Sequence, residues 1–104
     1  MSELKIIEKL TEDILGDNYF KYLFKKCSLI NAYYTINKDS INNLTDKEFK
    51  DSLRFADILS NSSNSLARNK SYQIITFLNF YYSNDKIYRT ISKAVYSKLG
   101  NFPA

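Results

Sequence analysis

The chain has 104 residues, which is enough for one hydrophobic core but not for several domains. It contains no histidine, no tryptophan, one cysteine and one methionine, so the usual general base near neutral pH and the commonest metal ligand are both missing. Fifteen Lys and Arg against eleven Asp and Glu leave a net charge of +4. We therefore expect a non-enzymatic protein with no catalytic residue, no metal site and no bound cofactor.

Cys27 cannot form an internal disulfide, because it is the only cysteine. No histidine is present to activate it as a nucleophile, so we expect a buried core thiol in a reducing compartment. No apolar run reaches the roughly 18 residues that a transmembrane helix needs, and the first residues lack the pattern of a signal peptide. These features predict a cytoplasmic protein without a membrane partner, and the abundance of Lys, Asn, Ile, Tyr and Phe is typical of low-GC bacterial genomes.

Residues 2–16 are expected to form a first helix. Ser2 can cap it, Gly16 ends it, and apolar residues recur every three or four positions at Leu4, Ile7, Leu10 and Ile14. The acidic residues of this helix are expected on its solvated face and are assigned no catalytic role: Glu8, Glu12 and Asp13.

A second helix is expected over residues 18–36, with Asp17 as its cap. Apolar side chains cover two of its sides, and only a narrow strip around Lys21, Lys25 and Ser28 is polar. Such a helix should pack against neighbours on two sides.

Thr45 and Glu48 form a capping box that starts a third helix. Its core stripe consists of Phe49, Leu53, Ala56 and Leu59, and the polar residues 60–65 end it in a loop. A fourth helix over residues 66–82 is apolar almost all the way round and is expected to be the most buried.

Asp85 is the expected cap of a fifth helix that ends at residue 99. The residues expected to face inward from this helix are Ile87, Ile91, Ala94, Val95 and Leu99. Because only residues 83–85 separate it from the fourth helix, the two should form an antiparallel α-hairpin of the kind used in helical repeats.

No segment alternates with period two for long enough to predict a strand. The sequence therefore predicts an all-α fold, a compact bundle of about five helices ending in an α-hairpin, with a repeat-like arrangement as the alternative. Residues 1–104 should form a single helical domain. Because Phe102 and Pro103 follow the helix-stopping Gly100, we expect this domain to be the N-terminal module of a longer protein, with Phe102 packed near Val95 and Leu99 or against a neighbouring copy.

Positive charge is concentrated in the second half of the chain, where residues 53–104 include seven basic and two acidic residues. The candidate contacts to a phosphate backbone are Arg68, Lys70, Lys86, Arg89 and Lys93, the last three on one arc of the fifth helix. Three tyrosines in the same region could stack on unpaired bases: Tyr72, Tyr88 and Tyr96. The alternative is that the cations only solvate an amphipathic helix and that the rings belong to the core.

Three segments carry a resemblance to a known group of proteins: residues 53–60 (LRFADILS), 68–75 (RNKSYQII) and 97–104 (SKLGNFPA). Together they resemble the helical N-terminal region of large bacterial DEAD/DEAH-type helicase-like proteins, in which a Leu-Gly-Asn-Phe-Pro stretch precedes the motor. The resemblance covers roughly the second half of the chain. It implies an accessory domain of an ATP-driven motor that lies outside this chain, since neither a Gly-Lys-Ser/Thr loop nor a DEAD/DEAH box occurs here.

The sequence thus favours a non-enzymatic accessory or docking domain, whose partner is another protein or a downstream domain of the same polypeptide. Two alternatives stay open. One is a module that binds nucleic acid weakly and without sequence preference, and the other is a stand-alone helical protein of the immunity or toxin-neutralising kind.

Overall fold

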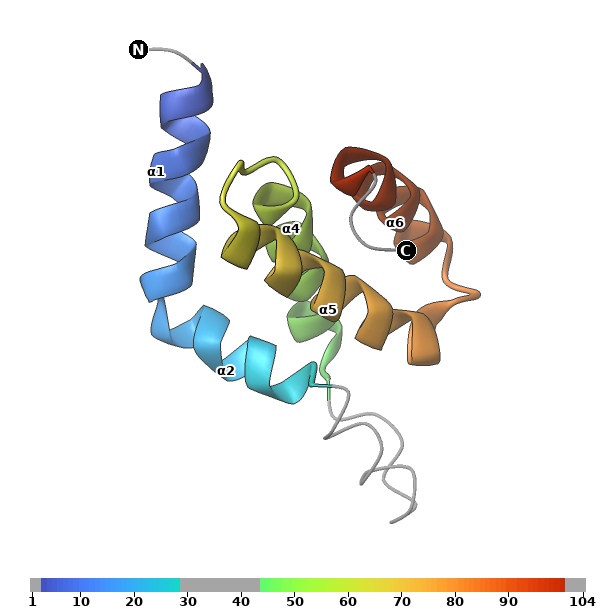
Figure 1. The fold of residues 1–104 in the computed structure, drawn as a ribbon. Coiled ribbons are helices and arrows are strands. Elements are labelled where there is room, and N and C mark those ends of the chain that lie inside the picture. The colour runs from blue at the N-terminus through green and yellow to red at the C-terminus, as the bar shows by residue number, and fades with distance from the viewer. Residues whose placement is uncertain (1–2, 29–43, 101–104) are drawn as a thin grey trace.

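The computed structural model describes residues 3–28 and 44–100, and within these ranges it contains five α-helices and no β-strand (Figure 1). The helices, labelled as in Figure 1, are α1 (Glu3–Gly16), α2 (Asn18–Lys26), α4 (Asp46–Leu59), α5 (Ser65–Tyr82) and α6 (Lys86–Leu99). The predicted all-α bundle is confirmed. None of the helices in the described ranges combines the length and the apolar content that a membrane crossing requires.

Apart from the end of α2, the helices of the described ranges begin and end within one residue of where the local sequence predicts. The Asp17 carboxylate accepts a hydrogen bond from the Phe20 N–H at 3.0 Å, and the Asp85 carboxylate accepts one from the Tyr88 N–H at 2.9 Å. Gly100 follows α6 with a φ of 58°, a left-handed conformation that suits glycine. α5 has Asn64 as its cap, whose side-chain oxygen accepts hydrogen bonds from two N–H groups of the first turn.

The capping box of α4 also attaches α2 to α4. Glu48 accepts a hydrogen bond from the Thr45 N–H at 2.9 Å, and the same carboxylate accepts the Tyr22 hydroxyl at 2.8 Å and pairs with the Lys26 ammonium at 3.3 Å. The Thr45 N–H, the Tyr22 hydroxyl and Lys26 together lower the pKa of Glu48 to about 2. An acid of the first turn of α4 therefore holds two helices together.

α4 is the centre of the bundle, because it packs against each of the other four described helices. Seven of its fourteen residues are buried, against six of the eighteen residues of α5. The expectation that residues 66–82 form the most buried helix is therefore wrong. α5 carries apolar side chains over most of its circumference, yet one side of it faces solvent, where Leu66 is 56% and Phe80 61% exposed.

α5 and α6 form the predicted antiparallel hairpin. The Asp85 N–H donates to the Tyr82 carbonyl at 2.9 Å in the turn, and the Arg68 guanidinium at the start of α5 reaches the Leu99 carbonyl at the end of α6. The two helices meet on a face of α6 that differs from the expected one. Tyr88, Ser92, Val95 and Leu99 are buried, Ile91 is half-buried, and Ile87 and Ala94 are exposed.

The buried face of α6 differs from the expected one because α6 packs against both α4 and α5. The Tyr88 ring is buried, and its hydroxyl donates to the Ile75 carbonyl of α5 at 2.8 Å. Since this bond satisfies the one polar group of a large ring, Tyr88 can be buried in place of Ile87.

α2 is shorter than predicted. The helix ends at Lys26, and the Cys27 N–H closes it on the Leu23 carbonyl at 2.9 Å. The Cys27 side chain is fully buried against α4, with its sulfur 3.7 Å from the Ser52 hydroxyl, and burial raises the pKa of the thiol to about 12. The prediction of a core thiol is confirmed, whereas an unbroken helix through residues 27 and 28 is wrong; residues 29–36 lie outside the described part.

Only the second half of α1 is buried in the bundle. Thr11 and Ile14 are buried there, but Leu4 and Leu10, which were expected in the core stripe, are 58% and 45% exposed. α1 packs on α2 and α4, and its first turns extend past the edge of the other helices (Figure 1). The expected packing of Phe102 falls outside the described residues.

Candidate functional site

The outer face of α6 brings three of the five predicted cations together. Burial of Tyr88, Val95 and Leu99 turns the opposite side of the helix to solvent, and Lys86, Arg89 and Lys93 lie there, all exposed. Their spacing of three and four residues keeps them on one side of the helix. The predicted arc on α6 is therefore present in the structure.

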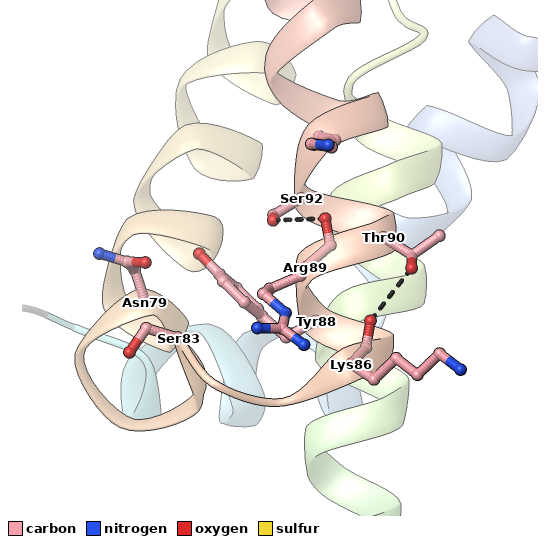
Figure 2. A pocket seen from close by; sticks show the side chains of 8 residues that line it. Asn79, Ser83, Lys86, Tyr88, Arg89, Thr90 and Ser92 are labelled. Carbon is pink, nitrogen blue, oxygen red and sulfur yellow. Dashed lines mark hydrogen bonds between the residues drawn. The ribbon is translucent and has the colours of Figure 1, made fainter.

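These cations line a cavity of about 380 Å³ at the turn between α5 and α6 (Figure 2). Asn79 and Ser83 contribute polar groups from α5, and Thr90 contributes one from α6. The Thr90 hydroxyl donates to the Lys86 carbonyl at 3.0 Å, so its oxygen keeps acceptor capacity while its proton is engaged. Among the described residues that line the cavity, none has an acidic side chain.

No carboxylate of the described residues forms an ion pair with these three cations. Within residues 3–28 and 44–100, none of Lys86, Arg89 and Lys93 has an ion-pair partner. The last lysine of α6 differs, since Lys98 forms an ion pair with Asp57 of α4. The face can therefore attract an anion without first breaking an internal ion pair.

The sequence matches no protein-family model, no curated protein and no solved structure. Within the described part of the chain, no three His, Cys, Asp or Glu side chains are grouped so as to hold a metal ion.

The other two predicted cations, Arg68 and Lys70, do not join the cavity. One Arg68 nitrogen donates to the Leu99 carbonyl at 2.7 Å and another to the Ser62 carbonyl at 3.5 Å, so this half-buried side chain closes the end of α6. The Lys70 ammonium lies 3.9 Å from the centre of the Phe24 ring, on the side of α5 that faces α2. Both cations have internal partners, which explains why the structure separates them from the cations of α6.

The three candidate tyrosines also differ in accessibility. Tyr88 is only 2% exposed and its hydroxyl is bound to α5, so it cannot stack on a base, and the alternative of a core ring is confirmed for this residue. Burial also raises the pKa of its hydroxyl. Tyr96 is 41% exposed, and its ring lies edge-to-face with Tyr72 at a centroid distance of 6.3 Å. Tyr72 is half-buried, which leaves Tyr96 as the accessible ring.

Sequence reasoning missed the polar side of the cavity contributed by α5. Asn79 and Ser83 are four residues apart, hence one above the other on the same side of the helix. The sequence signal that could have found them is two polar residues four apart just before a short turn. An antiparallel hairpin places the end of α5 beside the start of α6, so such residues lie next to the cations of α6.

A second surface involves the loop between α4 and α5. Glu8 was expected on the solvated face of α1, but its carboxylate accepts the Ser63 N–H at 3.0 Å and the Ser62 hydroxyl at 3.2 Å. The Ser63 N–H is the main cause of a lowered pKa of Glu8. The prediction of a purely solvated acid is wrong, because the exposed turns of α1 are tied to the bundle through this carboxylate.

Proposed function

We propose that the chain is a non-enzymatic accessory domain that docks onto a protein partner, next to the helicase-type motor that its resemblance implies. The observation that carries this proposal is the apolar surface on the first half of α1. Ile6 and Leu10 are 47% and 45% exposed and lie one turn apart on the same side of this helix, whereas Leu4, which is 58% exposed, lies on another side. Neighbouring exposed apolar side chains of this size are typical of protein interaction sites.

The contacts of Glu8 support a docking role because they fix this apolar surface in place. Four hydrogen bonds from Ser62 and Ser63 reach its two carboxylate oxygens. A partner that binds the exposed side of α1 therefore meets an already ordered helix. Binding to a preorganised surface avoids much of the entropic cost of ordering a segment.

A cavity of about 340 Å³ between α1, α2 and α4 adjoins the same surface. Leu10, Ile14 and Phe55 form its apolar walls, and Asp13 and Asp17 stand beside them. An apolar side chain of the partner that enters this cavity would make the kind of central, desolvated contact that dominates interface energies.

The test places a photo-crosslinking amino acid at position 6 in the cells of origin, with position 21 on α2 as the control site. A protein crosslinked from position 6 and absent from position 21 is then purified and titrated with the domain. Leu10→Ser should weaken this binding about tenfold. Ile87→Ser, at an apolar residue on α6 that is 46% exposed, should leave it unchanged. Equal crosslinking from both positions, or equal losses in both variants, would contradict docking through α1.

A second candidate function is weak contact with nucleic acid through α6. It is favoured by the absence of any ion-pair partner for Lys86, Arg89 and Lys93 in the described residues. Three cations on one helix face can follow phosphates. Because phosphate contacts carry no sequence information, this binding should be indifferent to sequence.

Fluorescence anisotropy with a labelled single strand and a labelled duplex, at low and at physiological salt, tests this second function. We expect affinity that falls steeply as salt rises. Failure of both probes to bind at low salt would remove the function, and tight binding independent of salt would show that phosphate contacts are not its basis.

A further inference from the structure

The three cations of α6 continue along the helix into an accessible aromatic ring. Lys86, Arg89, Lys93 and Tyr96 follow one another at spacings of three and four residues, so they lie on the same side of α6. At 1.5 Å per residue the row extends for about 15 Å. α5 borders it throughout, with Ser83 and Asn79 beside the cations and Tyr72 against Tyr96.

The length of this row matches a short piece of one strand. Lys86 and Lys93 are about 10 Å apart along the helix axis, which is enough for on the order of three phosphates of a stacked strand. The uncharged polar groups of Asn79 and Ser83 face the same cavity and can donate to phosphate oxygens. Phosphates from one strand are sufficient to occupy all three cations.

The ring at the end of the row favours an unpaired base. Tyr96 is 41% exposed, and its edge-to-face contact with Tyr72 holds the ring in a fixed orientation. An aromatic side chain beside a row of cations is the arrangement on which single-strand-binding proteins stack bases. A base inside a duplex is already stacked on both faces and cannot use this ring.

We propose that this row of side chains on α6, with the cavity beside it, binds single-stranded nucleic acid in preference to duplex. Lys86, Arg89 and Lys93 contact successive phosphates, and Tyr96 stacks on one unpaired base. This inference rests on the second proposed function and adds the form of nucleic acid that the surface selects.

Three labelled probes separate the contributions: a thymidine strand of about twelve nucleotides, an abasic strand of the same length and the matched duplex. The abasic strand keeps the phosphates and removes the bases. We expect the thymidine strand to bind at least about fivefold more tightly than the abasic strand, the low end of what one stacked base contributes. The duplex should bind no better than the abasic strand.

Variants assign the two contributions to residues. Tyr96→Leu should remove the advantage of the thymidine strand over the abasic strand, and Tyr96→Phe should keep it because the ring remains. Lys93→Gln should weaken both strands and reduce the salt slope by about 0.7. Lys21→Gln, at an exposed lysine of α2, is the matched control and should leave affinity and slope unchanged.

The outcomes distinguish this inference from the function on which it rests. If none of the probes binds at low salt, nucleic-acid binding itself fails. If all three bind equally, or Tyr96→Leu has no effect on a folded domain, phosphate contact stands and the single-strand inference is overturned. Equal losses of affinity in Lys21→Gln and Lys93→Gln would show that the net charge of the protein, and not this row of side chains, attracts the probe.

Discussion

Replacing Glu48 should destabilise the bundle at neutral pH and have little effect in acid. Its carboxylate accepts the Thr45 N–H, the Tyr22 hydroxyl and the Lys26 ammonium, which lower its pKa from 4.5 to about 2. A group whose pKa is lower in the folded chain contributes stability in full above its unfolded pKa. This contribution is therefore present above about pH 4.5 and is lost as the pH falls towards 2.

The size of the effect follows from the same pKa change. The difference between 4.5 and about 2 corresponds to at most about 3 kcal/mol of unfolding free energy. Solvent reduces this value, because the side chains of Glu48 and Lys26 are 12% and 29% exposed. We therefore expect Glu48→Gln, which keeps the shape of the side chain, to cost about 1 to 2 kcal/mol at pH 7.

Urea unfolding of the wild type and of Glu48→Gln, each at pH 7 and near pH 2, measures the difference. The gap at pH 7 should close towards the lower pH, where the wild-type carboxylate is also protonated. Asp46→Asn is the control, since within the described residues the ion pair of Asp46 is an exposed one with Lys50 on the same helix, and it should contribute less than about 0.5 kcal/mol. A variant as stable as the wild type at pH 7, or a gap that stays constant to pH 2, would refute the reasoning.

Three further changes have outcomes that chemical denaturation can measure. Ile75→Ala removes a fully buried side chain and should lower the unfolding free energy by about 2 to 5 kcal/mol. Phe80→Ala, at a residue 61% exposed on the same helix, should lower it by less than about 1 kcal/mol. Similar losses of stability in the two variants would contradict the orientation of α5. Tyr81→Phe should be neutral or stabilising by up to about 1 kcal/mol, because within the described residues the buried Tyr81 hydroxyl has no hydrogen-bond partner; a clear loss of stability would mean that the hydroxyl does have one. Arg68→Ala should lower the unfolding free energy by about 1 to 2 kcal/mol, because it leaves the Leu99 carbonyl without its donor. Amide hydrogen exchange at the end of α6 should also accelerate, and unchanged exchange there would exclude this capping role.

Apart from the end of α2, the ends of the described helices could be predicted from sequence because each depends on a few adjacent residues. Asp17, Thr45 and Asp85 bind backbone N–H groups three residues ahead, and Gly100 supplies a left-handed residue. The all-α class follows from the same local periodicity. None of these features requires knowledge of which helices meet.

Features that depend on two distant elements could not be predicted in this way. The inward face of α6 depends on the Ile75 carbonyl, which accepts the hydroxyl of Tyr88, and this partner is visible only once the hairpin is assembled. For the same reason, the charge pattern did not show that Arg68 is engaged by a helix end or that Lys70 lies over a ring. Only the three cations of α6, which lack such partners in the described residues, lie together on one exposed helix face as their spacing predicted.

The tether from Glu8 to the loop after α4 also bears on the order in which the chain assembles. α4, α5 and α6 follow one another with short connections, so they can pack through contacts that are local in sequence and therefore form early. The bond from the Ser63 N–H to Glu8 closes a separation of 55 residues, and it holds a helix whose first turns bury little apolar surface. α1 should therefore join the folding chain late and leave it first, at a lower free energy of opening than the three helices behind it.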